Sequence, residues 1–215
     1  MPDIEFPTVE GTGTGYLALP DDESGRGVVV LQERWDVDDH IRSVCDRLAR
    51  EGFVTMAPDF QHPEGTGPHP SVGATLEGAV VFVLGHEVTW GEQIGLVGFS
   101  YGGGLALWAA STKSNIAGAV AFYPVMNDMS VELWNVQCPI LAHIGTADAA
   151  VPSAATDELQ TAFEDAGVPA NLVYYDDAGH SFFNDADPGY DPRAAEAAWG
   201  RTVAFLNDSL GSTPE

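Results

Sequence analysis

The chain has 215 residues, of which 45% are hydrophobic, a length and composition typical of one globular domain with a sizeable core. Its 32 acidic and 8 basic residues give a formal net charge of −24, and Lys113 is the single lysine. Such a charge repels nucleic acid and anionic membranes, so we expect neither as a partner.

The first residues do not form a charged-then-apolar leader, and no apolar run approaches membrane-spanning length. We therefore expect a cytoplasmic protein, present as a monomer or a small homo-oligomer. The two cysteines are too few for a disulfide framework and lack the spacing of metal ligands, so we expect no metal and no cofactor. The acidic excess favours a halophilic source, because the acidic side chains repel one another at low ionic strength. At about 1 M salt the screening length falls to about 3 Å, which removes most of this repulsion. An acidic mesophile is the alternative.

Hydrophobic patterning predicts strands that alternate with helices. Residues 4–9 and 16–19 bracket the glycine-rich stretch 11–15 and are predicted as a β-hairpin turning there. Further strands are predicted at 27–32, 53–57, 94–97, 116–122, 139–144 and 171–175. Helices are predicted at 38–51, 72–85, 105–110, 153–166 and 193–210. Such βαβ units indicate the α/β class, with a mostly parallel sheet covered on both faces and a single domain over residues 1–215.

The strongest functional motif is Gly98-Phe99-Ser100-Tyr101-Gly102. It follows a short apolar strand and precedes a buried helix, which is the context of a nucleophile elbow. The glycines let strand and helix approach closely, and Ser100 is exposed at the carboxyl edge of the sheet above a helix N-terminus. The alternative is a glycine-rich turn of another α/β protein, such as a phosphate-binding loop.

A serine hydroxyl needs a base to take its proton, and the base needs an orienting carboxylate. In this fold class the chain order is Ser, acid, His, each after a strand. His180 follows the last predicted strand and is the expected base, and Asp148 follows strand 139–144 and is the expected acid. His143 lies within a strand and is interpreted as a core histidine. Weaker candidates for the acid are Asp128, Asp176 and Asp177.

The negative charge that develops on the substrate carbonyl oxygen needs two hydrogen-bond donors. One is expected to be the backbone N–H of Tyr101, directly after the nucleophile. The other is expected from the loop after strand 27–32, as the backbone N–H of Arg34.

Several stretches together resemble the dienelactone hydrolase (carboxymethylenebutenolidase) family of the α/β-hydrolase superfamily. They are Leu31-Gln32-Glu33, Gly52-Phe53-Val54 through Ala57-Pro58-Asp59, Gly98–Gly103, His143-Ile144-Gly145 with Asp148 and Val151-Pro152, and Ala178–Phe182. The resemblance covers nearly the whole chain. It implies a single-domain α/β-hydrolase fold, with an N-terminal hairpin and here a reduced cap, that hydrolyses an unsaturated lactone.

Two departures from the family pattern matter. The well-studied members use cysteine as nucleophile and a glutamate that matches Glu33, whereas this chain has Ser100 and needs His180 as base. Glu33 and Trp35 are then expected to support the nucleophile or shape the substrate pocket. The family also pairs the substrate carboxylate with arginines, where this chain has Asn184 and a shortened, arginine-free segment 59–91. We therefore expect neutral esters or lactones as substrates.

The leading hypothesis is a serine hydrolase that cleaves carboxylic esters or lactones through an acyl-enzyme, using Ser100, His180 and Asp148. Acyl transfer or peptidase-like cleavage on the same fold is the first alternative, and a non-catalytic binding module is the second. A metal enzyme based on His62 and His69 is a third, although their spacing is not a known ligand pattern. The same two histidines and Trp90 are candidates for lining the pocket.

Overall fold

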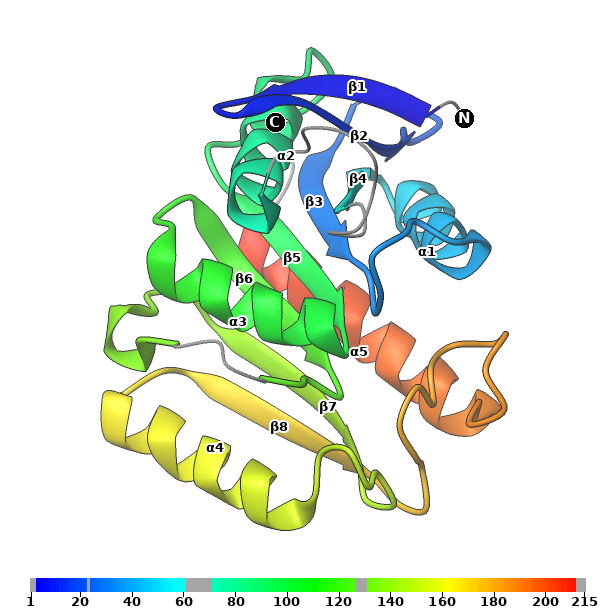
Figure 1. The fold of residues 1–215 in the computed structure, drawn as a ribbon, viewed down its shortest axis with the longest axis vertical. Coiled ribbons are helices and arrows are strands. Elements are labelled where there is room, and N and C mark those ends of the chain that lie inside the picture. Colours follow the sequence, from blue (N-terminus) through cyan, green and yellow to red (C-terminus); the bar gives the residue numbers. More distant parts are fainter. Residues whose placement is uncertain (1–2, 23, 61–70, 127–130, 212–215) are drawn as a thin grey trace. The chain divides into compact units, whose positions relative to one another are not determined.

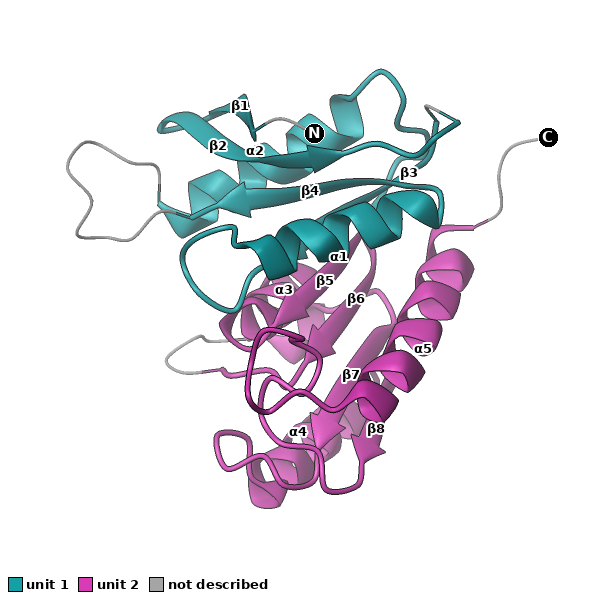
Figure 2. Ribbon diagram, turned by 90° about the vertical axis from the view of Figure 1, so that its right-hand side faces the viewer, with its two compact units in different colours: residues 1–94 teal, residues 95–215 magenta. Residues whose placement is uncertain are grey.

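The computed structural model describes residues 3–22, 24–60, 71–126 and 131–211. It divides into two compact units, residues 1–94 and 95–215, which are described here one at a time (Figure 2). The expectation of one domain over the whole chain stays a prediction.

The first unit contains four strands of the sheet, with one helix on each of their faces (Figure 1). Its elements are β1 (Asp3–Thr8), β2 (Gly11–Ala18), β3 (Arg26–Leu31), α1 (Asp39–Arg50), β4 (Phe53–Asp59) and α2 (Val72–Gly85). The strand order is β1-β2-β4-β3, with β2 antiparallel to both of its neighbours and β3 parallel to β4. The parallel pair follows from the crossover through α1, as the alternating pattern predicted.

The N-terminal hairpin is present, but its predicted turn is wrong. The chain turns at Val9 and Glu10, and the glycine-rich stretch 11–15 forms the start of β2. A Cβ at Gly13 would lie 2.6 Å from the ring of Phe6, and one at Gly15 would lie 2.6 Å from the carbonyl oxygen of Ala57. These glycines therefore allow close packing across the sheet, a use that the local sequence does not distinguish from a turn.

Helix α1 shows how the sequence sets its own limits. Asp38 caps the first turn, accepting a hydrogen bond from the Ile41 N–H at 2.9 Å. Its apolar stripe, formed by Ile41, Val44, Cys45 and Leu48, is buried. Gly52 follows the helix with a φ of +92°, a conformation that glycine adopts without strain. Burial of each large apolar side chain contributes about 1.5–3 kcal/mol, which fixes the helix on β4.

The second unit contains the strands β5 (Ile94–Phe99, whose first residue ends the first unit), β6 (Ile116–Phe122), β7 (Ile140–Gly145) and β8 (Ala170–Tyr175) in the order β5-β6-β7-β8. Strands β6, β7 and β8 are parallel. The helices are α3 (Tyr101–Thr112), α4 (Ser153–Ala166) and α5 (Pro192–Leu210), with a short 3₁₀ turn, η1 (Leu133–Asn135). Helices α3 and α4 cover one face and α5 the other (Figure 1).

The core of the second unit is apolar and aromatic. Every residue of β5 and β7 is buried, which is typical of parallel strands with helices on both faces. Four aromatic rings pack together near the carboxyl ends of β5 and β6, at centroid distances of 4.7 to 6.4 Å. They belong to Phe99, Phe122, Tyr123 and Phe183. Within the described residues, no helix is both long enough and apolar enough to cross a membrane.

Candidate active site

Ser100 occupies a sharp turn between β5 and α3. Its φ of +50° and ψ of −112° lie in a region that residues with a Cβ rarely adopt. The turn is held by the Ser100 N–H, which donates to the Phe122 carbonyl at 3.0 Å, and by the Ser100 carbonyl, which accepts from the Val125 N–H at 3.0 Å. Helix α3 begins at the next residue, Tyr101, as expected for a nucleophile elbow.

The glycines around Ser100 permit this turn. A Cβ at Gly98 would collide with the carbonyl group of Gly102. One at Gly103 would lie 3.0 Å from the Phe122 carbonyl oxygen and 3.1 Å from Pro124. Glycine is therefore required where the helix starts against the strand.

Asp148 lies in the loop after β7, and its side chain is fully buried. Its Oδ1 accepts hydrogen bonds from the N–H groups of Ala150 at 2.7 Å and Val151 at 3.1 Å. Burial raises the pKa of this carboxyl, but hydrogen bonds from His180 and the two backbone N–H groups outweigh burial and leave the pKa lowered. Asp148 is therefore held as a carboxylate.

His180 connects the other two residues. Its Nε2 lies 2.8 Å from the Ser100 Oγ, and its Nδ1 lies 2.7 Å from the free Oδ2 of Asp148. Its side chain is 29% exposed, so the ring is reachable from solvent while the carboxylate behind it is not. With Asp148 ionised, Nδ1 carries the proton and Nε2 is free to accept the proton of the serine. The three side chains, far apart in sequence, thus form one hydrogen-bonded row.

The loops that bear Asp148 and His180 are joined to each other. The Ala147 N–H donates to the Ala178 carbonyl at 2.9 Å, and the Asp177 N–H donates to the Thr146 Oγ1 at 2.9 Å. A Cβ at Gly145 would collide with the Ala178 carbonyl, so the absence of a side chain there lets the loops approach. This contact fixes the relative position of base and acid.

His143 is a core histidine, as expected, with no exposed surface. Tyr123 was not expected from sequence. Its φ is +36°, its side chain is buried, and its ring meets the ring of His180 edge-on at 4.9 Å. A tyrosine directly after a buried strand was the available signal, but it does not by itself indicate a contact with a loop nearly 60 residues later.

Glu33, Arg34 and Trp35 belong to the first unit, in the bend after β3. Glu33 and Trp35 are half-buried and Arg34 is exposed. The buried Gln32 holds this bend, because its side-chain amide donates to the carbonyls of Trp35 at 3.0 Å and Pro58 at 2.8 Å. The proposed oxyanion role of Arg34 and the pocket roles of Glu33 and Trp35 stay predictions.

Other candidates have simpler places. Asn184 is buried, and its Oδ1 accepts from the Ala186 N–H at 3.0 Å, which stabilises a turn. Trp90 stacks on the guanidinium of Arg26 at 5.5 Å. His62, His69 and Asp128 lie outside the described residues. Among the described residues, no group of three or more His, Cys, Asp or Glu side chains is arranged to hold a metal ion.

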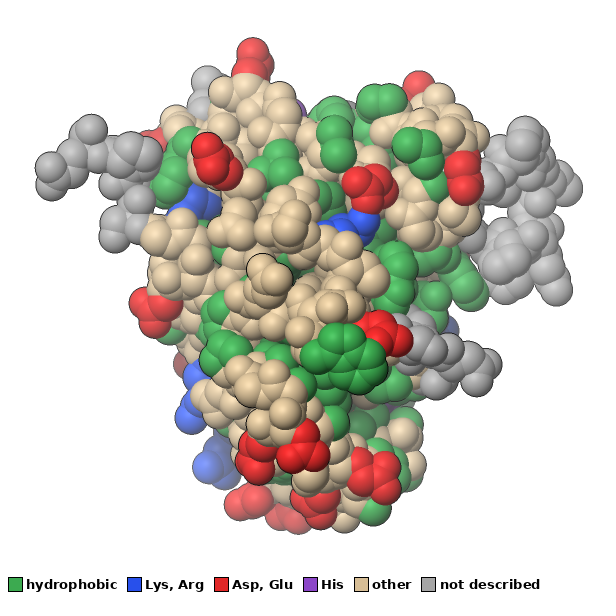
Figure 3. All heavy atoms as spheres, turned by 90° about the vertical axis from the view of Figure 1, so that its left-hand side faces the viewer, with side chains coloured by type: hydrophobic (Ala, Val, Ile, Leu, Met, Phe, Trp, Pro, Cys, Tyr) green, Lys and Arg blue, Asp and Glu red, His purple; other side chains and the backbone are tan. Residues whose placement is uncertain are grey.

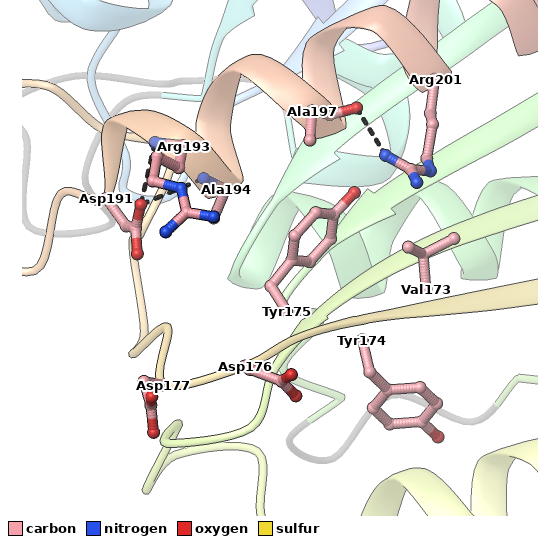
Figure 4. A pocket seen from close by; sticks show the side chains of 10 residues that line it. All are labelled: Val173, Tyr174, Tyr175, Asp176, Asp177, Asp191, Arg193, Ala194, Ala197 and Arg201. Atoms are coloured by element: carbon pink, nitrogen blue, oxygen red, sulfur yellow. Dashed lines mark hydrogen bonds between the residues drawn. The ribbon is translucent and has the colours of Figure 1, made fainter.

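A pocket of about 500 Å³ lies between β8 and the first half of α5, and no residue of the triad lines it (Figure 4). Asp176 and Asp177, the weaker candidates for the acid, line it and are exposed. Tyr175, at the end of β8, and Arg193 and Arg201 of α5 also line it. This pocket had no signal in the sequence, because its walls come from segments about 20 residues apart that share no motif.

Comparison with known proteins identifies the family. Residues 14–210 match the dienelactone hydrolase family. A Salmonella typhimurium protein provisionally named carboxymethylenebutenolidase is 30% identical, with 89% of this chain and 81% of that protein covered. Protein usf of Aquifex pyrophilus is 29% identical over 96% of this chain and 98% of its own length.

Solved structures agree on the fold. The crystal structure of a Klebsiella pneumoniae protein provisionally named dienelactone hydrolase has a TM-score of 0.86 at 24% identity, covering 95% of this chain and 97% of that one. The Pyrococcus furiosus esterase Pf2001 has a TM-score of 0.76 at 22% identity, covering 98% and 93%. The fold is therefore the α/β-hydrolase fold, and the chain belongs to the dienelactone hydrolase family, the hydrolases of carboxylic esters and lactones.

Proposed function

We propose that the chain is a serine hydrolase that cleaves neutral carboxylic esters or lactones through an acyl-enzyme on Ser100. The observation that carries this proposal is the row of two hydrogen bonds, 2.8 Å from Ser100 to His180 and 2.7 Å from His180 to Asp148. The first distance is within the range in which a base can take the proton of its nucleophile, and the second is within the range in which a carboxylate orients that base.

The mechanism has two halves. Ser100 Oγ attacks the carbonyl carbon while His180 Nε2 takes the hydroxyl proton, and the buried carboxylate of Asp148 stabilises the imidazolium that forms. The N–H groups of Tyr101 and Arg34 are the proposed donors to the oxyanion. His180 then gives its proton to the leaving alkoxide, which departs as an alcohol. Water, deprotonated by His180, then attacks the acyl carbon. The bond to Ser100 Oγ breaks, His180 returns the proton to that oxygen, and the acid is released.

The preference for neutral substrates rests on missing positive charge. The segment 59–91 contains no arginine or lysine, and Asn184 stands where the family has an arginine. Its side-chain oxygen is engaged by the Ala186 N–H within its own turn. A chain of net charge −24 also repels anions at long range.

The first test replaces the nucleophile. Ser100→Ala is expected to lower kcat for p-nitrophenyl butyrate by at least about 10⁴-fold, as for other serine triads. The matched control is Ser111→Ala on the same helix, whose hydroxyl donates to the Trp108 carbonyl at 2.8 Å and which we expect to keep wild-type activity. Equal rates in wild type and Ser100→Ala would contradict the proposal.

The acyl-enzyme and the substrate class are tested separately. Wild type quenched during turnover of p-nitrophenyl acetate is expected to carry one acetyl group on the peptide that contains Ser100, and Ser100→Ala none. In molar KCl, the anionic p-nitrophenyl hemisuccinate is expected to show at least about tenfold lower kcat/KM than the neutral butyrate, because neither the segment 59–91 nor position 184 supplies an arginine to pair with its carboxylate. Equal values would contradict the neutral preference and leave the serine mechanism intact.

A further inference from the structure

A buried polar chain crosses the second unit behind the triad. His143 of β7 has no exposed surface, and both of its ring nitrogens have partners. Nδ1 lies 2.9 Å from the hydroxyl of Tyr175, the last residue of β8, and Nε2 lies 3.1 Å from the Oγ1 of Thr202 on α5. Burial, assisted by the charge of Arg201, lowers the pKa of His143 to about 3, so the ring is neutral at physiological pH.

The neutral ring of His143 carries one N–H and one unprotonated nitrogen, so it donates one of these two hydrogen bonds and accepts the other. The hydroxyls of Tyr175 and Thr202 can each donate or accept, so either arrangement of the ring proton keeps both bonds. Arg201, which lines the same pocket as Tyr175, donates to the Ala197 carbonyl at 3.1 Å. The two hydrogen bonds of His143 thus join α5, β8 and β7.

Tyr175 stands where the two loops of the triad begin. Its backbone carbonyl accepts from the Thr146 N–H at 3.0 Å, in the loop that leads to Asp148, and from the Ala178 N–H at 3.4 Å, in the loop that leads to His180. Its ring packs on Phe182 at 5.0 Å, just after His180. The tyrosine therefore contacts both ends of the segment that carries the base.

The segment that follows Tyr175 has an open pocket on one side. The segment after Tyr175 borders the open pocket of about 500 Å³ that separates it from the first turns of α5 (Figure 4). Asp176 and Asp177 are exposed there and Ala194 lies on the opposite wall. Without close packing on that side, a hydrogen bond from the end of β8 into the core has a larger share in fixing the loop.

We propose that Tyr175 is a positioning residue whose hydroxyl, held by His143, fixes the loop that presents His180 to Asp148. The inference deepens the proposed serine mechanism and rests on it for its consequence in catalysis. Its structural core, the geometry of the bond between His180 and Asp148, can be measured without any turnover.

The primary measurement is the proton resonance of His180 Nδ1–H, which a short hydrogen bond to a carboxylate shifts far downfield. Loss of this resonance in Asp148→Asn would assign it to the proton between His180 and Asp148. Tyr175→Phe keeps the ring and removes the hydroxyl, and we expect the exchange of this proton with water to become about fivefold faster, the factor expected for one lost hydrogen bond. With activity expressed per titrated serine, kcat is expected to fall by about tenfold with KM unchanged, because small displacements of catalytic groups slow the chemical step.

Tyr174→Phe is the matched control, since Tyr174 is the neighbouring residue and its side chain is 44% exposed. It is expected to keep the wild-type signal and kcat. The inference would be overturned if the His180 Nδ1 proton exchanged with water at the wild-type rate in Tyr175→Phe, or if both variants changed this rate equally. Should Tyr175→Phe fail to fold, His143→Phe removes the ring nitrogen that holds the hydroxyl. A wild-type exchange rate of the His180 proton in that variant would overturn the inference as well. A wild-type rate in Ser100→Ala would instead refute the proposed function while leaving the proton signal to be judged by itself.

Discussion

At the scale of single residues, backbone strain gathers around the triad. The described residues other than glycine that have a positive φ are Ser100, Tyr123, Asp177 and Ser181. The first is the nucleophile, the second packs on His180, and the other two flank the loop that holds it. Each such conformation costs about 1–3 kcal/mol and persists only where the surroundings enforce it. Here the N–H groups of Tyr123 and Asp177 are each held, by the His143 carbonyl at 2.7 Å and the Thr146 hydroxyl at 2.9 Å.

The buried His143 makes a prediction about acid stability. The pKa of His143 is lowered to about 3 in the folded protein. In the unfolded chain the imidazole of His143 takes up a proton near pH 6.5, whereas in the folded chain it stays neutral down to about pH 3. This residue therefore lowers the free energy of unfolding by about 1.4 kcal/mol for each pH unit between about 6.5 and 3. His143→Gln, which cannot titrate, is expected to show a slope shallower by that amount in urea unfolding at pH 4 to 6. Parallel slopes for variant and wild type would contradict the assignment.

At the scale of elements, sequence patterns predicted what depends on local repetition. The bounds of α2, β6 and α4 coincide with the predicted 72–85, 116–122 and 153–166, because a buried apolar face or stripe ends there at a cap or a turn. Helix α3 begins at Tyr101, earlier than the predicted 105, since glycines that normally disfavour a helix are needed at its close contact with β5. The prediction of the hairpin turn was wrong for a related reason, because glycine can serve close packing as well as a turn.

The candidate site was predictable where chain order constrains it. Ser100, Asp148 and His180 could be named because each follows a strand, and strands of one parallel sheet end at one edge. The contacts of Tyr175 and His143 could not be named. They depend on the register of β7 with β8 and on the rotation of α5, and neither quantity has a local signature in sequence.

The contact between the two triad loops yields a prediction for Gly145. Gly145→Ala places a methyl group against the Ala178 carbonyl and is expected to lower the free energy of unfolding by roughly 2–4 kcal/mol. It should also reduce kcat about 10- to 100-fold, by displacing His180 from Asp148. Gly200→Ala on α5 is the control, because its Cβ meets nothing within 4 Å. That change is expected to stabilise the helix by about 0.5–1 kcal/mol and leave kcat unchanged, as measured by urea unfolding and ester turnover. Wild-type kcat in Gly145→Ala would contradict this account.

At the scale of the whole molecule, charge is the dominant feature. On the face drawn in Figure 3, acidic side chains are widely scattered and basic ones are sparse, and several acidic groups gather at its lower end, where α4 lies. Helix α4 exposes Asp157, Glu158, Glu164 and Asp165 and contains no basic residue. Like charges this close repel one another in dilute buffer, and the repulsion is greatest in the compact folded state.

Salt is therefore expected to stabilise the protein. Between dilute buffer and molar KCl the Debye length falls from tens of ångströms to about 3 Å, which removes most of the repulsion among exposed carboxylates. The melting temperature is expected to rise steadily over this range at pH 7. The triple variant Asp157→Asn, Glu158→Gln, Asp165→Asn removes three charges from the exposed face of α4 and should raise the melting temperature in dilute buffer and flatten its salt dependence. If added KCl raised the melting temperature of the triple variant as much as that of the wild type, the ions would act by strengthening apolar burial rather than by screening. Strengthening of burial does not depend on those carboxylates.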